Sequence, residues 1–241
     1  MKKPLLIAVT LLTLAVTGSF AQNKRVAVVS FYVSKQIDVS DFGPLAKEAA
    51  NQLSANPDFN VTPLLISYHD QFFNTYAKNF PFDLVAEGDV INTDAYKTFV
   101  PLLSPDEPAG YQKYATPYTG YKIMTNWSEK DNNKKLLAMF SQYDGIMRVS
   151  IGFTMLKYGF NNMGVVRMEA TTYITLHNKD GKKIYSFVEN GKSKSVSPMV
   201  AGIPVMTPDK VLPMCQSAMD ELITSLNKDL PKLIKKADEK L

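Results

Sequence analysis

The most regular feature of the chain is an alternation of apolar and polar residues between Val165 and His177. Successive side chains of a β-strand point to opposite faces, so this period of two predicts a strand with one buried face. The apolar set comprises Val166, Met168, Ala170, Thr172, Ile174 and Leu176. The run from Ile146 to Lys157 alternates in the same way, and its apolar face carries Met147, Val149, Ile151, Phe153 and Met155. These two runs predict neighbouring strands.

A third strand is expected after Asp180-Gly181, because this dipeptide favours a two-residue turn between antiparallel strands. That turn sets a register which places two aromatic side chains on the apolar face, with Tyr185 opposite Leu176 and Phe187 opposite Ile174. A loop that shifts the register by one residue exchanges them for Ile184 and Val188. Residues 143–189 therefore predict an antiparallel meander, and a polar loop is expected from Asn190.

The segment before the meander predicts a β-α-β start. Arg25 to Val33 is a β-rich run typical of a buried strand. A helix is expected from Pro44, capped by Ser40 or Asp41, with a face formed by Leu45, Ala49 and Leu53. A further short strand is expected from Phe59 to Leu65. No Gly-x-Gly-x-x-Gly follows the first strand, so no dinucleotide site is expected.

The end of the chain predicts a long amphipathic helix that begins at Thr207-Pro208-Asp209. Its apolar stripe consists of Val211, Cys215, Ala218, Leu222 and Leu226. Pro213 is expected to separate or kink the first turn, and Pro231 to bend or break the end. Placed across the apolar face of the meander, this helix completes an α/β (α+β) fold with a mixed sheet covered by helices.

The remaining segments define the domain organisation. Residues 1–21 predict a signal peptide, with Lys2 and Lys3 before a short apolar core and cleavage after Ala21. Residues 22–241 are expected to form one α/β domain with a helical, loop-rich middle at about 66–140, in which helices are expected near 72–76, 94–103 and 129–142. Cleavage leaves no expected membrane span.

Charge and cysteine content exclude some classes of function. Without Lys2 and Lys3 the formal net charge falls from +4 to +2, so a nucleic-acid partner is not expected. Cys215 is the single cysteine, which excludes an intramolecular disulfide and fits a small buried side chain. An exported chain of this kind fits the bacterial envelope, either periplasmic or outer-membrane associated.

Few residues are candidates for catalysis or for binding a ligand. His69 and His177 are the two histidines; His177 is expected on the surface, and His69-Asp70 has no further ligand at metal-binding spacing. We therefore expect no metal and no cofactor. Asp83, Glu87 and Asp89 form an acidic cluster that would suit general acid–base catalysis on a sugar. Acidic clusters of this kind are more commonly found on solvent-exposed turns. The preferred candidate for a binding site is a tyrosine-rich loop that carries Tyr111, Tyr114, Tyr118 and Tyr121. The alternative is that these rings pack beneath the loop as a small separate hydrophobic core.

The order of elements supports a resemblance. The hairpin Thr-Leu-His-Asn-Lys-Asp-Gly-Lys-Lys-Ile-Tyr-Ser (175–186), the Gly-Lys-Ser segment at 191–193 and the closing helix resemble the curli-secretion-channel and penicillin-binding-protein-activator lipoproteins. The domain is also similar to the N-terminal domain of the Tol–Pal β-propeller protein. The resemblance covers residues 25–60 and 143–228. The lipid-anchoring cysteine is absent, residues 66–140 have no counterpart, and no functional residue carries over.

The resemblance implies envelope assembly or accessory binding and no enzyme. We therefore expect a non-enzymatic cell-envelope accessory protein that binds an envelope partner protein or self-associates. The alternative, from a different class, is a periplasmic glycan-binding protein or hydrolase that uses the acidic cluster from Asp83 to Asp89.

Overall fold

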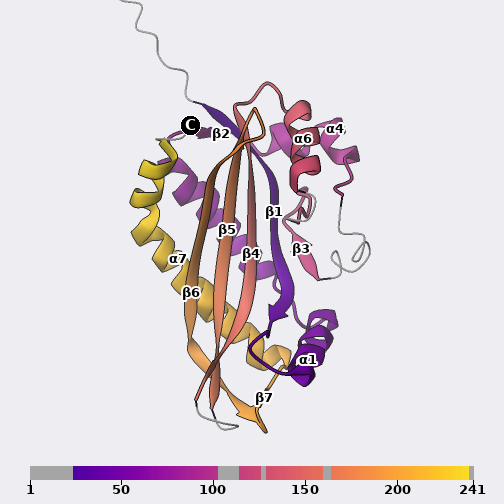
Figure 1. The fold of residues 1–241 in the computed structure, drawn as a ribbon, viewed down its shortest axis with the longest axis vertical. Coiled ribbons are helices and arrows are strands. Elements are labelled where there is room, and N and C mark those ends of the chain that lie inside the picture. Colours follow the sequence, from indigo (N-terminus) through magenta and orange to yellow (C-terminus); the bar gives the residue numbers. More distant parts are fainter. Residues whose placement is uncertain (1–23, 103–113, 126–128, 160–163, 239–241) are drawn as a thin grey trace, which may run out of the picture.

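A mixed, twisted sheet forms the centre of the molecule (Figure 1). The computed structural model describes residues 24–102, 114–125, 129–159 and 164–238. Its strands are β1 (Arg25–Asp38), β2 (Asp83–Leu84), β3 (Ala115–Pro117), β4 (Gly145–Tyr158), β5 (Val165–Asn178), β6 (Lys183–Val200) and β7 (Ile203–Pro204). They lie in the order β2-β1-β4-β5-β6-β7, and β3 pairs with β1. β1 is parallel to β2 and β4, whereas the other pairs are antiparallel.

Helices cover the sheet on both faces near β1. They are α1 (Pro44–Ala55), α2 (Thr62–Gln71), the π-helical turn η1 (Phe72–Tyr76), η2 (Ala77–Asn79), α3 (Gly88–Ile91), α4 (Asp94–Thr98), α6 (Glu129–Met139) and α7 (Pro208–Asp238). The larger core packs α1, α2, η1 and α7 against one face of the sheet. A smaller core packs α3, α4 and α6 against the opposite face at β1. Together with the strand order, this confirms the predicted fold class. In the described residues no helix is both long and apolar enough to cross a lipid bilayer.

The meander is confirmed, including its register. Leu176 pairs with Tyr185 and Ile174 pairs with Phe187. The turn differs from the prediction, because Asn178 and Lys182 close it and Gly181, at a φ of 79°, occupies the left-handed region. A β-bulge between Leu176 and His177 adds the residue that restores the predicted aromatic register.

The long helix lies along β5 and β6, as predicted (Figure 1). All five residues of the predicted stripe are buried in the larger core. The helix continues through Pro213 and Pro231 to Asp238, so neither proline breaks it. Packing of this apolar stripe outweighs the hydrogen bond that each proline removes.

The first strand and the helix from Pro44 form as predicted, but the short strand expected from Phe59 to Leu65 is wrong. Thr62–Gln71 forms α2, because Pro63 suits a first helical turn and the Asn60 side chain accepts a hydrogen bond from the Thr62 N–H. The parallel neighbours of β1 come instead from β2 and β4. The N-cap of α1 is Gly43 rather than Ser40 or Asp41. Leu53 is buried as predicted, but Ala46 and Ala50 replace Leu45 and Ala49 on the buried face, which leaves Leu45 exposed.

The polar loop expected after Glu189 is also wrong. β6 continues to Val200, and its backbone there packs against α7. The Lys194 N–H donates a hydrogen bond to the Ser217 hydroxyl of α7, and the Lys194 ammonium contacts Glu221 at 2.6 Å. The helix therefore holds this part of the strand in place. The predicted signal peptide, residues 1–21, lies outside the described residues.

Candidate functional site

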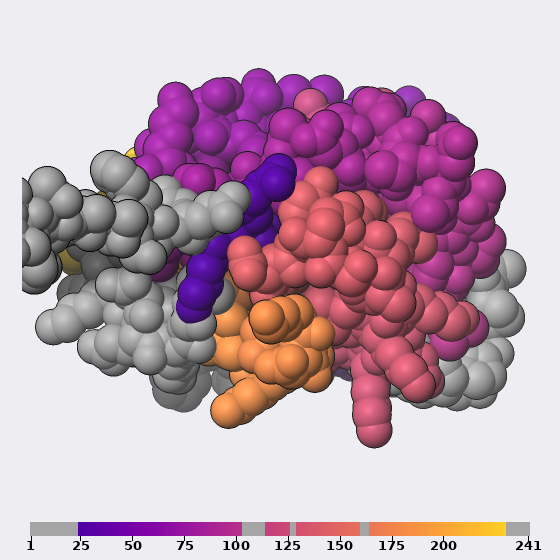
Figure 2. Space-filling model, turned by 90° about the horizontal axis from the view of Figure 1, so that it is seen from above, coloured from indigo at the N-terminus to yellow at the C-terminus, as the bar shows by residue number. Residues whose placement is uncertain are grey.

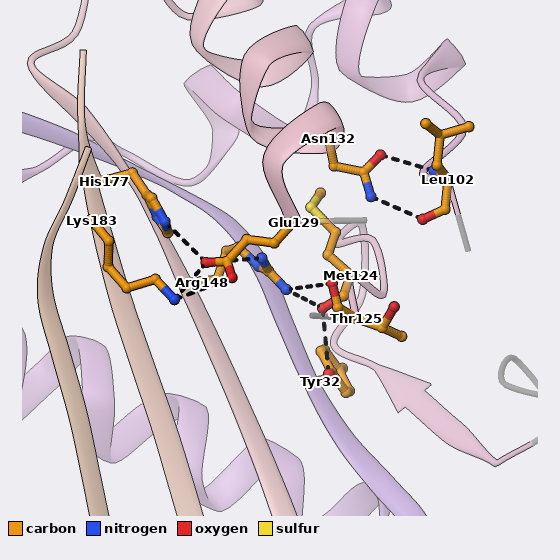
Figure 3. A network of polar contacts seen from close by, with 9 residues as sticks. All are labelled: Tyr32, Leu102, Met124, Thr125, Glu129, Asn132, Arg148, His177 and Lys183. Atoms are coloured by element: carbon orange, nitrogen blue, oxygen red, sulfur yellow. Dashed lines mark hydrogen bonds and ion pairs between the residues drawn. The ribbon is translucent and has the colours of Figure 1, made fainter. Parts of the chain in front are cut away.

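A network of charged side chains centres on Glu129, the first residue of α6 (Figure 3). Its Oε1 lies 2.9 Å from His177 Nε2, 3.0 Å from Lys183 Nζ and 3.7 Å from Arg148 Nη1. Lys183 Nζ also donates to Oε2 at 3.1 Å. One carboxylate therefore ties the start of α6 to three strands of the meander.

Arg148 is the buried cation of this network, with 7% of its surface exposed. Its Nη2 donates to the carbonyl oxygens of Met124 at 2.5 Å and Thr125 at 3.0 Å. The Tyr32 hydroxyl of β1 donates to the same Met124 oxygen at 3.4 Å (Figure 3). A buried charge is costly unless it is paired and hydrogen-bonded, and Glu129 with these carbonyls supplies both.

His177 is buried, with 3% of its surface exposed, so the predicted surface position is wrong. The cause is α6, which packs over the end of β5 and places Glu129 against the imidazole. Burial lowers the pKa of His177 below its ordinary value; Glu129 opposes this, while Lys183 and Arg148 lower the pKa further. The 2.9 Å contact with Glu129 therefore opposes, but does not cancel, the effect of burial on this pKa.

Two hollows flank this network. The larger, of about 840 Å³, lies between α6 and the β5–β6 turn and is lined by Glu129, Lys130, Asn133, Lys134, Leu137, Ala138, His177, Lys179, Asp180, Gly181 and Lys183. Figure 2 looks onto this end, where α6 and the turn lie side by side next to the first residues of β1. The smaller hollow, of about 300 Å³, lies on the uncovered face of the sheet and includes Arg148, Tyr173 and Lys183 in its wall.

A second cluster joins three features of the sequence. His69 Nε2 lies 2.7 Å from Glu87 Oε1, and the Tyr121 hydroxyl donates to the same oxygen at 2.8 Å. The Tyr118 ring stacks on the imidazole with centroids 3.5 Å apart. Burial and the neighbouring Glu87 raise the pKa of Tyr121. His69, the acidic cluster and the tyrosine loop, which are separate in the sequence, therefore meet in one place.

The predicted site residues have different environments. Tyr111 lies outside the described residues. The Tyr114 carbonyl accepts a hydrogen bond from the Lys35 N–H, and Tyr121 is only 4% exposed. Asp83 in β2 and Asp89 in α3 are exposed, so of the three acids it is Glu87 that His69 and Tyr121 engage. Among the described residues no group of three or more His, Cys, Asp or Glu side chains is placed to hold a metal ion.

Sequence reasoning missed the Glu129 network. Its charged members span 54 residues of the sequence, from Glu129 to Lys183. They do not recur at a helical or strand period that would indicate that they lie together. The available signal was an arginine on the polar face of an otherwise uncharged strand, because Arg148 has no charged neighbour in β4 before Lys157. A charge in that position calls for a partner from another element.

Comparisons with known proteins give little further information. No family model and no curated protein matches the sequence. A lipoprotein from Neisseria meningitidis is 10% identical, with 87% of this chain and 99% of that chain covered and a TM-score of 0.34. A neuraminyllactose-binding hemagglutinin homolog from Helicobacter pylori is 11% identical, with 90% and 92% covered and a TM-score of 0.36. Both scores are too low to carry an argument, and the resemblance drawn from the sequence stays a prediction.

Proposed function

We propose that this chain is an exported, non-enzymatic protein of the cell envelope, periplasmic or outer-membrane associated, that binds a partner protein along β6. The observation that carries the proposal is the free outer edge of this strand. β6 pairs with β5 on one side, and on the other side β7 pairs only with Met199 and Val200. Within the described residues, no strand lies against the outer edge from Lys183 to Pro198.

An open strand edge presents unpaired N–H and C=O groups, which an extended segment of another protein can complete. Part of this edge is closed internally, because the Asn190 N–H donates to the Glu189 side chain and the Lys194 N–H to Ser217. The N–H groups of alternate residues point the same way along a strand, so the Val188 N–H also points outward. The stretch from Lys183 to Glu189 is therefore the part of the edge that suits a partner.

The uncovered sheet face beside this edge is largely polar, but it carries one exposed apolar pair. Tyr173 and Val188 are register partners on β5 and β6, and they are 46% and 51% exposed. The neighbouring hollow of about 300 Å³ has Arg148 and Lys183 as its charged lining residues, so it is basic. These features fit an extended partner segment with apolar side chains on one face and an acidic side chain at the hollow.

The test is site-specific crosslinking in intact cells. A photoreactive residue at Val188 is expected to crosslink to one extended segment of an envelope protein, mapped by mass spectrometry. The double variant Tyr173→Lys, Val188→Lys places charges on the exposed pair and is expected to abolish copurification of that protein. Both positions are about half exposed, so folding should be preserved, as checked by circular dichroism.

The matched control is the double variant Leu45→Lys, Ile66→Lys, which introduces the same two charges at apolar residues of α1 and α2 that are 69% and 46% exposed. Copurification is expected to be unchanged in this variant. Crosslinks between copies of the chain would show that the partner is a second copy of this protein. If the partner protein still copurifies with the Tyr173→Lys, Val188→Lys variant, the role of β6 is refuted. Absence of a crosslink from Val188 to any protein would overturn the proposal.

A further inference from the structure

The cavity of about 840 Å³ between α6 and the β5–β6 turn has a basic rim. Four lysines line it, Lys130 and Lys134 from α6, Lys179 from the turn and Lys183 from the start of β6, against two acids, Glu129 and Asp180. We propose that this cavity binds a small organic anion that carries a phosphate or carboxylate group on a short apolar chain.

The acids in the wall leave positive charge uncompensated. The Glu129 carboxylate already contacts His177, Lys183 and Arg148, and Arg148 does not line the cavity. No carboxylate of the described residues forms an ion pair with Lys130, Lys134 or Lys179. Like charges around one concave site repel one another, and a bound anion relieves that repulsion. Lysine ammonium groups are strong point-charge donors to phosphate and carboxylate oxygens.

The other residues that line the cavity indicate what the rest of the ligand must be. Leu137 and Ala138 give the α6 side an apolar surface, which suits a short hydrocarbon segment. Asn133 and His177, each 3% exposed, also line the cavity, and each retains a buried side-chain atom, Oδ1 and Nδ1, with no hydrogen-bond partner among the described residues. Polar atoms buried in this way are rarely left without partners, which marks this wall as a place where a polar group is missing.

The first experiment measures binding of four probes by calorimetry: hexyl phosphate, hexanoate, hexanol and inorganic phosphate. Hexyl phosphate is expected to bind at one site, and more tightly than either hexanol or inorganic phosphate. The reason is that it alone of the three combines an anionic group with an apolar chain. Hexanoate distinguishes a carboxylate from a phosphate ligand. If no probe binds, or if hexanol binds as well as hexyl phosphate, the anion site is refuted.

The second experiment locates the site. The double variant Lys130→Gln, Lys134→Gln is expected to weaken hexyl phosphate binding by at least about tenfold. Lys135→Gln removes the same charge from α6 at a residue that does not line the cavity, and its binding constant is expected to be unchanged. Ala138→Trp places a large side chain in the cavity wall without a change of charge and is expected to weaken binding. Equal weakening by Lys134→Gln and Lys135→Gln single variants would show diffuse attraction and overturn the proposal.

A third comparison separates a soluble anion from a lipid headgroup. Vesicles of phosphatidylglycerol present the same phosphate chemistry on a surface. We expect hexyl phosphate in solution to bind and to compete with any vesicle binding. Vesicle binding that depends on Lys130 and Lys134 without any binding of soluble probes would replace the small anion by a membrane surface.

Discussion

Gly191 in β6 lies in backbone contact with Leu222 in α7. A Cβ atom added at Gly191 would lie 2.0 Å from the Leu222 nitrogen and 2.5 Å from the Glu221 carbonyl carbon. Main-chain atoms of a packed helix cannot rotate away as a side chain does. The spacing between the long helix and the edge of the meander is therefore set by the absence of a side chain at this residue.

We predict that Gly191→Ala lowers the free energy of unfolding by about 3 kcal/mol, the upper end of the usual cost of overpacking, because α7 must move away from the sheet to admit the methyl group. The measurement is chemical denaturation followed by circular dichroism. Gly152→Ala in β4 is the control, since the nearest heavy atom to its added Cβ, Tyr173 Cε2, is 3.9 Å away. Similar losses in the two variants would contradict the contact.

A second prediction concerns Tyr96, which is fully buried in the smaller core. Its hydroxyl donates to the Val29 carbonyl at 2.7 Å and accepts from the Lys122 N–H at 3.0 Å. Val29 lies at the register shift between β1 and β4, so the tyrosine satisfies a carbonyl at an irregular point of the sheet.

Tyr96→Phe should lower the free energy of unfolding by about 1–3 kcal/mol, because it leaves both backbone groups without this partner. Denaturation in urea measures the loss. Tyr173→Phe removes the same atom from a side chain that is 46% exposed, and its stability should stay within about 0.5 kcal/mol of the parent protein. A loss in Tyr96→Phe no larger than that in Tyr173→Phe would show that the Tyr96 hydroxyl contributes nothing.

The sequence was sufficient for the parts of the fold that are set by periodicity. The alternation through β4 and β5 predicted which side chains are buried, and the stripe from Val211 to Leu226 predicted the helix that covers them. The strand register was also correct, although the turn was not two residues long, since a bulge compensated for the difference. Apolar periodicity is a local property, which is why it can be read without the tertiary structure.

The candidate site could not be predicted in this way, because its contacts are long-range. Glu129 is one of several charged residues at the start of an amphipathic helix, and nothing local distinguishes it from Asp131. Its role depends on α6 packing across the end of β5, which brings His177 to it. The same limit applies to Glu87, whose partners His69 and Tyr121 come from segments before and after it.

Cys215 gives a third prediction. It is fully buried under the meander, and this burial raises the pKa of its thiol. The thiolate is the reactive form, so the native protein should react with a disulfide reagent far more slowly than the protein unfolded in guanidinium. A colorimetric thiol assay across the unfolding transition measures this. A rate in the native state close to that of free cysteine would contradict the burial of the thiol.

A fourth prediction concerns His177 and acid. Because its pKa is lower in the folded than in the unfolded chain, the unfolded state takes up the proton first as the pH falls below about 6.5. The stability that the neutral imidazole contributes is therefore complete above that pH and is lost as the pH falls toward the folded-state pKa. His177→Gln removes this titration, so the stability difference between parent and variant should shrink or reverse between neutral and mildly acidic pH. Urea denaturation at a series of pH values measures it.

The neighbouring charges predict the direction in which this pKa moves. Lys183 lowers the pKa of His177, so Lys183→Met should raise it toward its ordinary value and reduce the loss of stability in acid. NMR titration of the imidazole Cε1–H measures the shift, and a His69→Gln background leaves His177 as the one remaining histidine signal. Lys182→Met, in the adjacent turn and absent from the contacts of Glu129, is the control and should leave the pKa unchanged. An unchanged or lower His177 pKa in Lys183→Met would contradict repulsion between this ammonium and the protonated imidazole.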